Sequence, residues 1–359
     1  MLVSKYYTGV VLVIGLALVF SFHSVRADRG PAFASRLRPV ATSQDYTIAR
    51  GLSVAYIGDS LMKDFALSSP VDILWKGNVS AFGNGIIDDS SSLNSPMSLF
   101  KLLSREGPVR IEEFARPGAT VNDSQVSVAN QFALWMKDFH RQTTSLLSMT
   151  PLPQLTAIWI GHNDLDWAYN QPEAALKSPG DRLASIREKF RLKYEAELNR
   201  LAQLMTVESR KNGRRFSIVV FGLIHSADTF IAHSAAREKH RQDAKLYPYI
   251  EQVVEERFPS LKPEYAPTMV ALQEMLDADL KAMVENLQSQ ILTPDVHIRY
   301  SPALSEVDLK DPAILNTDDG FHLSAFGQSI IAREIFRAIQ PELNFLGWPG
   351  DLKTKNIPN

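Results

Sequence analysis

Short hydrophobic runs alternate along the chain with longer segments in which apolar residues recur every three or four positions. The runs are rich in β-branched residues and span 52–57, 109–114, 155–160, 216–223 and 296–300. The first, third and fourth show little polar alternation, which is typical of strands covered on both faces. We therefore predict five strands, three of them buried on both sides.

Four segments have the spacing of amphipathic helices. Their apolar residues are Val126, Ala129, Phe132, Ala133, Met136 and Phe139; Leu183, Ile186, Phe190, Tyr194, Leu198 and Leu201; Leu272, Leu276, Leu280, Met283 and Leu287; and Ile331, Ile335 and Ile339. Strands that alternate with helices in this way predict an α/β fold, in which helices cover both faces of a parallel sheet.

Two stretches interrupt this alternation. Residues 62–104 are rich in Gly, Ser and Asn and are expected to form a long loop over the end of the first strand. Residues 225–268 are charged, and we interpret them as a solvated helical insert rather than a moving lid. The expected domain spans 51–340, between a polar linker at 28–50 and a C-terminal tail at 341–359.

The first 27 residues have the pattern of an export signal. Lys5 precedes an uncharged run at 9–20, and Val25-Arg26-Ala27 offers small residues at positions suited to cleavage before Asp28. We expect a cleaved signal peptide and an exported protein, periplasmic or secreted, with no membrane span afterwards. The alternative is an uncleaved anchor formed by the uncharged stretch 6–25.

Composition narrows the choice of partners. The 359 residues are 45% hydrophobic and 22% charged, and 38 basic and 40 acidic residues give a net charge of −2. Such a balance gives no reason to expect a nucleic acid or an anionic membrane as a partner. The chain has no cysteine, which excludes disulfides and thiolate metal sites and suits a bacterial periplasm or culture medium. The oligomeric state stays open.

Polar residues stand where several of the strands are expected to end. They are Gly58-Asp59-Ser60-Leu61, Gly118, Gly161-His162-Asn163-Asp164 and, before the last helix, Asp319 and His322. Open α/β sheets bind their ligands at the carboxyl ends of the strands. Each group also has a simpler explanation, because Gly, Asp and Ser form turns, Asn163-Asp164 could cap a helix, and Asp-x-x-His is common on surfaces.

Ester hydrolysis needs a hydroxyl, a base, a group that orients the base, and donors for the developing oxyanion. Ser60 can supply the hydroxyl, His322 the base and Asp319 the orienting carboxylate. The donors can be the backbone N–H groups of Ser60 and Gly118 and the side-chain amide of Asn163.

Ser324 is expected to be the N-cap of the last helix.

These four blocks, in this order over residues 52–340, resemble those that define the SGNH (GDSL) hydrolase superfamily. The resemblance implies a three-layer α/β/α sandwich with a five-stranded parallel sheet. It also implies Ser60 as the nucleophile, Asp319 and His322 as the rest of the triad, and Gly118 and Asn163 in the oxyanion hole.

Stretches such as "LWKGNVSAFGNG" and "FARPGATVND" are similar to the phospholipase B-like lipases of that superfamily. That branch usually has glycine where His162 stands, and we interpret His162 as a structural or pocket-wall residue rather than a second base. Apolar residues of the first loop either form an acyl slot or pack the loop against the domain: Leu74, Trp75, Phe82, Ile86 and Ile87.

We therefore expect a cofactor-independent, exported serine esterase or lipase that acts on a small-molecule or lipid ester. The alternatives are a carbohydrate O-acetyl esterase or acyltransferase, and a non-catalytic binding protein with the same fold. No metal is expected, because the histidines and aspartates of the charged insert lack a recognised ligand spacing. These residues are His225, Asp228, His233, His240 and Asp243.

Overall fold

The structure is a computed structural model. It describes residues 51–63, 98–115, 119–122, 138–169, 179–224, 235, 266–309, 311, 313–315 and 323–348. The expected signal segment and linker, and most of the charged insert, lie outside the described residues.

Five parallel strands form one sheet in the order β2-β1-β3-β4-β5. The strands are β1 (Leu52–Gly58), β2 (Val109–Glu113), β3 (Leu155–Trp159), β4 (Phe216–Phe221) and β5 (Val296–Ser301). Every position of β3 and β4 is buried. The five predicted strands are thus confirmed.

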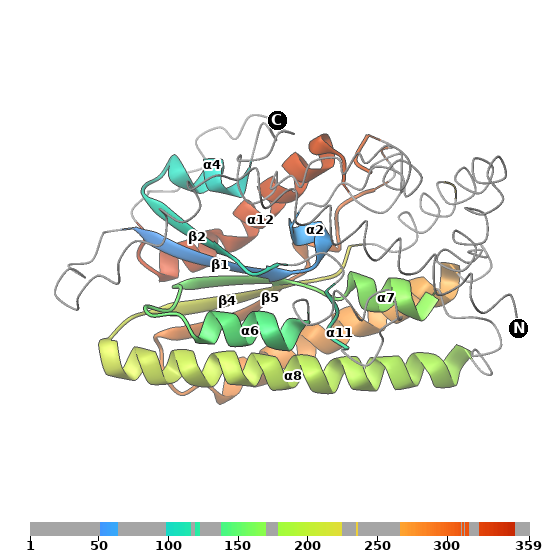
Figure 1. Ribbon diagram of the computed structural model, residues 1–359, viewed down its shortest axis with the longest axis horizontal. Coiled ribbons are helices and arrows are strands. Elements are labelled where there is room, and N and C mark those ends of the chain that lie inside the picture. Colours follow the sequence, from blue (N-terminus) through green and yellow to red (C-terminus); the bar gives the residue numbers. More distant parts are fainter. Residues whose placement is uncertain are drawn as a thin grey trace, which may run out of the picture. The chain divides into compact units, whose positions relative to one another are not determined.

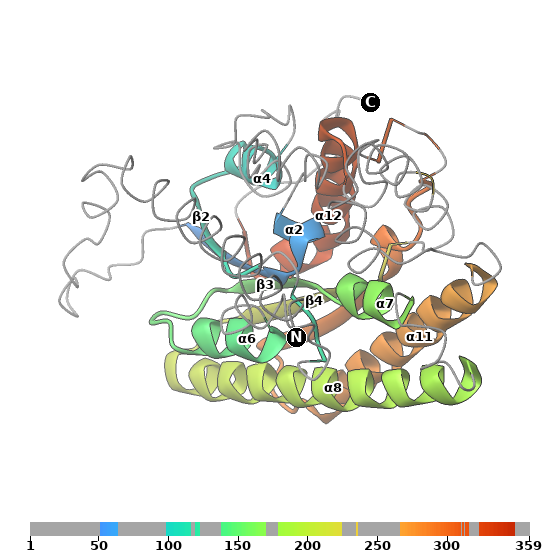
Figure 2. The same ribbon diagram turned by 45° about the vertical axis from the view of Figure 1, so that its right-hand side comes forward.

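Helices cover both faces of this sheet, which gives the expected three-layer α/β/α arrangement (Figures 1 and 2). One face carries α6 (Phe139–Leu147), α7 (His162–Tyr169), α8 (Pro179–Asn212) and α11 (Ala266–Gln290). The other carries α2 (Ser60–Lys63), α4 (Leu99–Ser104) and α12 (Ala325–Phe345). A short 3-10 turn, Pro302–Leu304, follows β5.

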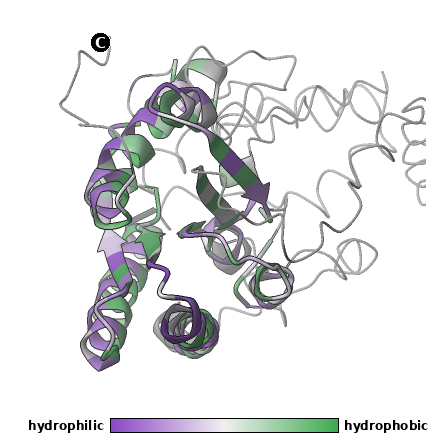
Figure 3. Ribbon diagram, turned by 90° about the vertical axis from the view of Figure 1, so that its left-hand side faces the viewer, coloured by the Kyte–Doolittle hydropathy of each residue, from purple (hydrophilic) through white to green (hydrophobic). Residues whose placement is uncertain are grey.

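The alternating geometry of a strand divides the core into two clusters. In β1, Ala55 and Ile57 pack with the α8 and α11 side, whereas Val54 and Tyr56 pack with the α4 and α12 side. The helices carry hydrophilic as well as hydrophobic residues along their length (Figure 3). The long helices α8, α11 and α12 therefore bury one face in the core and expose the other.

The predicted helices at 183–201, 272–287 and 331–339 are confirmed by α8, α11 and α12. Most of the predicted helix at 126–139 lies outside the described residues, and α6 begins where that pattern ends. α4 shows that the stretch 62–104, expected to be a loop, ends in a helix. α12 continues past residue 340, and Leu343 and Trp348 are buried in the core. None of the helices within the described ranges is both long and apolar enough to span a membrane.

Candidate active site

The strand order singles out the carboxyl ends of β1 and β3. From β1 the chain adds β2 on one side and then returns to add β3 on the other, which makes this pair of strand ends the topological switch point. Open α/β sheets bind ligands at such points. Gly58 pairs with Trp159 across the two strands. Ser60 and Asn163 follow these strands, at the first residue of α2 and in the first turn of α7.

The end of β1 is held by a glutamine from α6. The Gln142 side chain accepts a hydrogen bond of 2.9 Å from the Gly58 N–H and donates one of 2.9 Å to the Gly58 carbonyl. A Cβ on Gly58 would lie 2.5 Å from the Met62 Cβ and 2.7 Å from the Trp159 carbonyl oxygen, so only glycine fits. Sequence analysis missed Gln142, because a helical glutamine gives no signal of a long-range contact.

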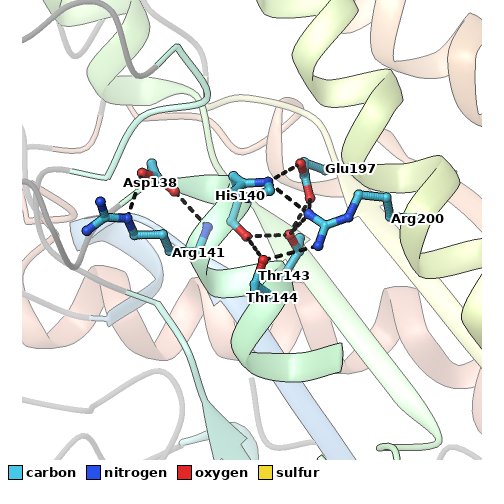
Figure 4. A network of polar contacts seen from close by, with 7 residues as sticks. All are labelled: Asp138, His140, Arg141, Thr143, Thr144, Glu197 and Arg200. Carbon is cyan, nitrogen blue, oxygen red and sulfur yellow. Dashed lines mark hydrogen bonds and ion pairs between the residues drawn. The ribbon is translucent and has the colours of Figure 1, made fainter. Parts of the chain in front are cut away.

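Helix α6 is in turn fixed to α8 by a polar network (Figure 4). The mostly buried Glu197 carboxylate lies 2.7 Å from His140 Nδ1 and 2.5 Å from Arg200 Nη1, and it also accepts a hydrogen bond from the Thr143 hydroxyl. Asp138 caps the start of α6. Because His140 and Thr143 flank Gln142, this network restricts the movement of the glutamine that holds Gly58.

Asp59 is fully buried and organises the turn after β1. Its Oδ1 accepts a hydrogen bond of 3.0 Å from the Leu61 N–H, across Ser60. Its Oδ2 lies 2.9 Å from His162 Nδ1 and accepts a longer bond of 3.3 Å from the His162 N–H. The carboxylate therefore links the segment that contains Ser60 to the start of α7.

Asn163 and Asp164 connect α7 to the segment that follows β2. The Asn163 side-chain nitrogen donates a hydrogen bond of 2.9 Å to the carbonyl of Ala119, the residue directly after Gly118. The Asp164 carboxylate accepts bonds of 2.8 and 2.9 Å from the N–H groups of Val121 and Asn122. Both side chains thus bind another segment of the chain. They do not cap α7, because this helix already begins at His162.

The structure describes only one of the remaining predicted site residues. Ser60 is described as the start of α2, without its side chain, whereas Gly118, Asp319 and His322 lie outside the described residues. The described chain resumes at Leu323, which is buried and pairs with Leu315. Ser324 is the N-cap of α12, as predicted, and its hydroxyl accepts a bond of 3.0 Å from the Gly327 N–H.

The profile of the GDSL-like lipase/acylhydrolase family matches residues 54–335, most of the chain. The chain belongs to this family. It is therefore a hydrolase that acts on ester bonds. A search of curated proteins finds no significant match to it.

Solved structures of lipases and esterases are similar to this GDSL family hydrolase at low sequence identity. An extracellular lipase from Streptomyces rimosus is 15% identical with a TM-score of 0.38, and the match covers 80% of this chain and 99% of that one. A phospholipase A1 from Streptomyces albidoflavus is 14% identical with a TM-score of 0.40, covering 80% and 98%. A lipase from a goat rumen metagenome is 12% identical with a TM-score of 0.41, covering 80% and 97%.

Two buried carboxyl groups of the GDSL hydrolase, Asp164 and Asp277, have raised pKa values. Burial, with a smaller contribution from the charge of Asp59, raises the pKa of Asp164 to about 7, against the opposing effect of the hydrogen bonds from Val121 and Asn122. Burial also raises the pKa of Asp277 to about 6, although its carboxylate accepts a hydrogen bond of 2.8 Å from the Leu223 N–H.

The raised pKa of Asp164 predicts a loss of stability as the pH rises. Between its ordinary value of 3.8 and about 7, the folded protein keeps a proton that the unfolded chain has released. Relative to Asp164→Asn, the wild-type free energy of unfolding is therefore expected to fall by on the order of 3 kcal/mol between about pH 4.5 and about pH 7.5. Urea unfolding of both proteins at about pH 4.5 and about pH 7.5 measures this difference. A difference that stays constant with pH would contradict the assignment.

Proposed function

We propose that the chain is an exported serine esterase or lipase that cleaves acyl esters through an acyl-enzyme. Ser60 is the nucleophile, His322 the general base, and Asp319 the carboxylate that orients His322. The backbone N–H groups of Ser60 and Gly118 and the side-chain amide of Asn163 form the oxyanion hole. No cofactor takes part in this reaction.

The observation that carries the proposal is the position of the Asn163 amide. It follows β3 at the topological switch point, beside the strand that leads to Ser60, and it is bonded to the residue after Gly118. The amide nitrogen has two protons, and the Ala119 carbonyl uses one of them. Asn163 is also partly exposed, unlike its buried neighbours His162 and Asp164, so its second proton can reach a bound substrate.

In the proposed reaction, the Ser60 hydroxyl attacks the ester carbonyl carbon while His322 takes its proton. The carbonyl oxygen becomes an oxyanion, and the amide of Asn163 donates to it together with the two backbone N–H groups. His322 then gives the proton to the leaving alcohol, which departs and leaves an acyl group on Ser60. Water, activated by His322, attacks this acyl-enzyme and releases the carboxylic acid.

The proposed substrate is an ester with an apolar acyl chain. Support comes from the stretches similar to phospholipase B-like lipases and from the apolar residues of the first loop, which lie outside the described residues. A panel of nitrophenyl esters tests it beside lysophospholipid and acetylated xylan. Each CH₂ that enters an apolar slot adds about 0.8 kcal/mol of binding, so kcat/KM is expected to rise about fifteen-fold from acetyl to butyryl esters. A steady fall with chain length would instead indicate a carbohydrate O-acetyl esterase.

The export proposal is supported by the pattern of residues 1–27. The protein for the ester panel can be produced with this segment present and recovered from the exported fraction. Its N-terminal residue is then expected to be Asp28. Recovery in the membrane fraction with Met1 intact would indicate an uncleaved anchor.

A further inference from the structure

The side chain of His162 joins the carboxyl ends of three neighbouring strands. Its backbone follows β3, its Nδ1 lies 2.9 Å from Oδ2 of Asp59 after β1, and its Nε2 lies 3.2 Å from the backbone nitrogen of Ile224 after β4. The imidazole packs against Trp159 in a T-shaped arrangement, with the ring centroids 4.9 Å apart. Only 3% of His162 is exposed.

These contacts define the tautomer of the His162 ring. The Ile224 N–H donates to Nε2, so this nitrogen carries a lone pair. The proton of the neutral imidazole is therefore on Nδ1, where it is donated to Asp59. The backbone that donates to Nε2 is held in place as well. The Asp277 carboxylate of α11 accepts a hydrogen bond from the N–H of Leu223, the residue before Ile224, and the Gln273 side chain donates one to the Leu223 carbonyl.

The hydrogen bond from His162 acts on the segment that contains Ser60. Asp59 directly precedes Ser60, and its other carboxylate oxygen accepts from the N–H of Leu61, directly after Ser60. The orientation of this one carboxylate thus restricts the backbone on both sides of Ser60. Asp59 is fully buried, so water does not compete for its oxygens.

We propose that His162 is a positioning residue for Ser60: its Nδ1–H orients the Asp59 carboxylate, which holds the Ser60 turn in its reactive geometry. This inference rests on the proposed role of Ser60 as the nucleophile. His162 does not act as a second base, since its ring is buried and both ring nitrogens are already engaged.

Two substitutions separate the two hydrogen bonds of the ring. In His162→Asn, the side-chain amide nitrogen can take the place of Nδ1 and donate to Asp59, but nothing reaches Ile224. In His162→Gln, the side-chain oxygen can take the place of Nε2 and accept from Ile224. The side-chain donor to Asp59 is then lost, and only the longer bond from the backbone N–H of residue 162 remains. Each variant lacks one buried hydrogen bond, so their thermal midpoints are expected to fall by similar amounts.

Their activities are expected to differ. A misplacement of about 1 Å can cost on the order of a hundred-fold in rate, so His162→Gln should lose about ten- to a hundred-fold in kcat with a similar KM. His162→Asn should stay within about five-fold of the wild type. The rate at which a serine-reactive phosphonate labels Ser60 should follow the same order, because it reports the nucleophile directly.

The control is Ser217→Ala, which removes a buried hydrogen bond of 2.7 Å from the Ser217 hydroxyl of β4 to Glu342 and contacts neither His162 nor Asp59. It should lower the thermal midpoint and leave kcat within about three-fold. Equal losses of kcat in both His162 variants, or a greater loss in His162→Asn, would overturn the positioning role. So would a rise in KM alone. If His162→Gln does not fold, Asp59→Asn replaces it, and an unchanged kcat in that variant would overturn the role.

A failure of the proposed function would look different. The phosphonate would then label wild-type protein at a residue other than Ser60, whatever the His162 variants do. Labelling of Ser60 at one rate in the wild type and in both variants would leave the nucleophile in place and reject His162 alone.

Discussion

Replacement of Ser60 by alanine is expected to lower kcat by about 10⁴- to 10⁶-fold, because no other group on the turn after β1 can form the acyl-enzyme. His322→Ala should cause a loss of the same order. The double variant should be no worse than either single one, since the two residues act as a unit. Ester turnover and phosphonate labelling by mass spectrometry measure both effects, and the fold should stay intact because Ser60 stands at a helix start.

Ser145→Ala is a suitable control, because Ser145 is an exposed serine of α6. It should turn over ester and take up the phosphonate at the wild-type rate. If the phosphonate labels Ser60→Ala as strongly as the wild type, the nucleophile lies elsewhere.

The sheet could be predicted from the sequence because its central strands are covered on both faces. β3 and β4 are buried at every position, so each appears in the sequence as a nearly continuous apolar run. α6 was not predicted at its described position, since two of its four buried residues are the polar Gln142 and Thr143. Buried polar residues interrupt the apolar periodicity on which the prediction of a helix depends.

The candidate site could be predicted only at the level of single residues. Ser60 and Asn163 stand directly after strands, where a parallel sheet collects its functional groups. The contacts that hold them join residues far apart in the sequence: Gln142 is 84 residues from Gly58, and His162 is 103 residues from Asp59. No local pattern marks such a pair, because Gln, Asp and His are ordinary surface residues as well.

These contacts hold each segment at the carboxyl ends of β1 and β3 from another element. Gly58 is held by α6, Asp59 by His162, and the segment after β2 by Asn163 and Asp164. Reactive groups placed on turns need such supports, because a turn alone does not hold a side chain within the narrow limits that catalysis requires. The buried polar groups around Ser60 thus hold the turn between rigid strands and helices.

Asn163→Ala is expected to lower kcat by about a hundred- to a thousand-fold while KM stays within about three-fold. The reason is that the amide donates to a charge that exists only in the transition state, so its loss affects the rate and not the binding of the ester. Asn163→Asp should be at least as impaired, because a carboxylate at this position opposes the oxyanion. Steady-state kinetics on one nitrophenyl ester gives both constants.

The same substitution also removes the hydrogen bond to Ala119, so a control must test whether loosening that segment alone explains the loss. Thr120→Val serves this purpose, because it removes a hydrogen bond of 3.4 Å from the Thr120 hydroxyl to the Asn122 carbonyl within the same segment. Its kcat should stay within about three-fold of the wild type. A large loss in Thr120→Val, or a rise in KM without a change in kcat in Asn163→Ala, would show that Asn163 acts on the segment or on the bound ester instead. Only a fall in kcat confined to the Asn163 variants is the signature of an oxyanion donor, because no other role of this amide depends on a charge absent from the ground state.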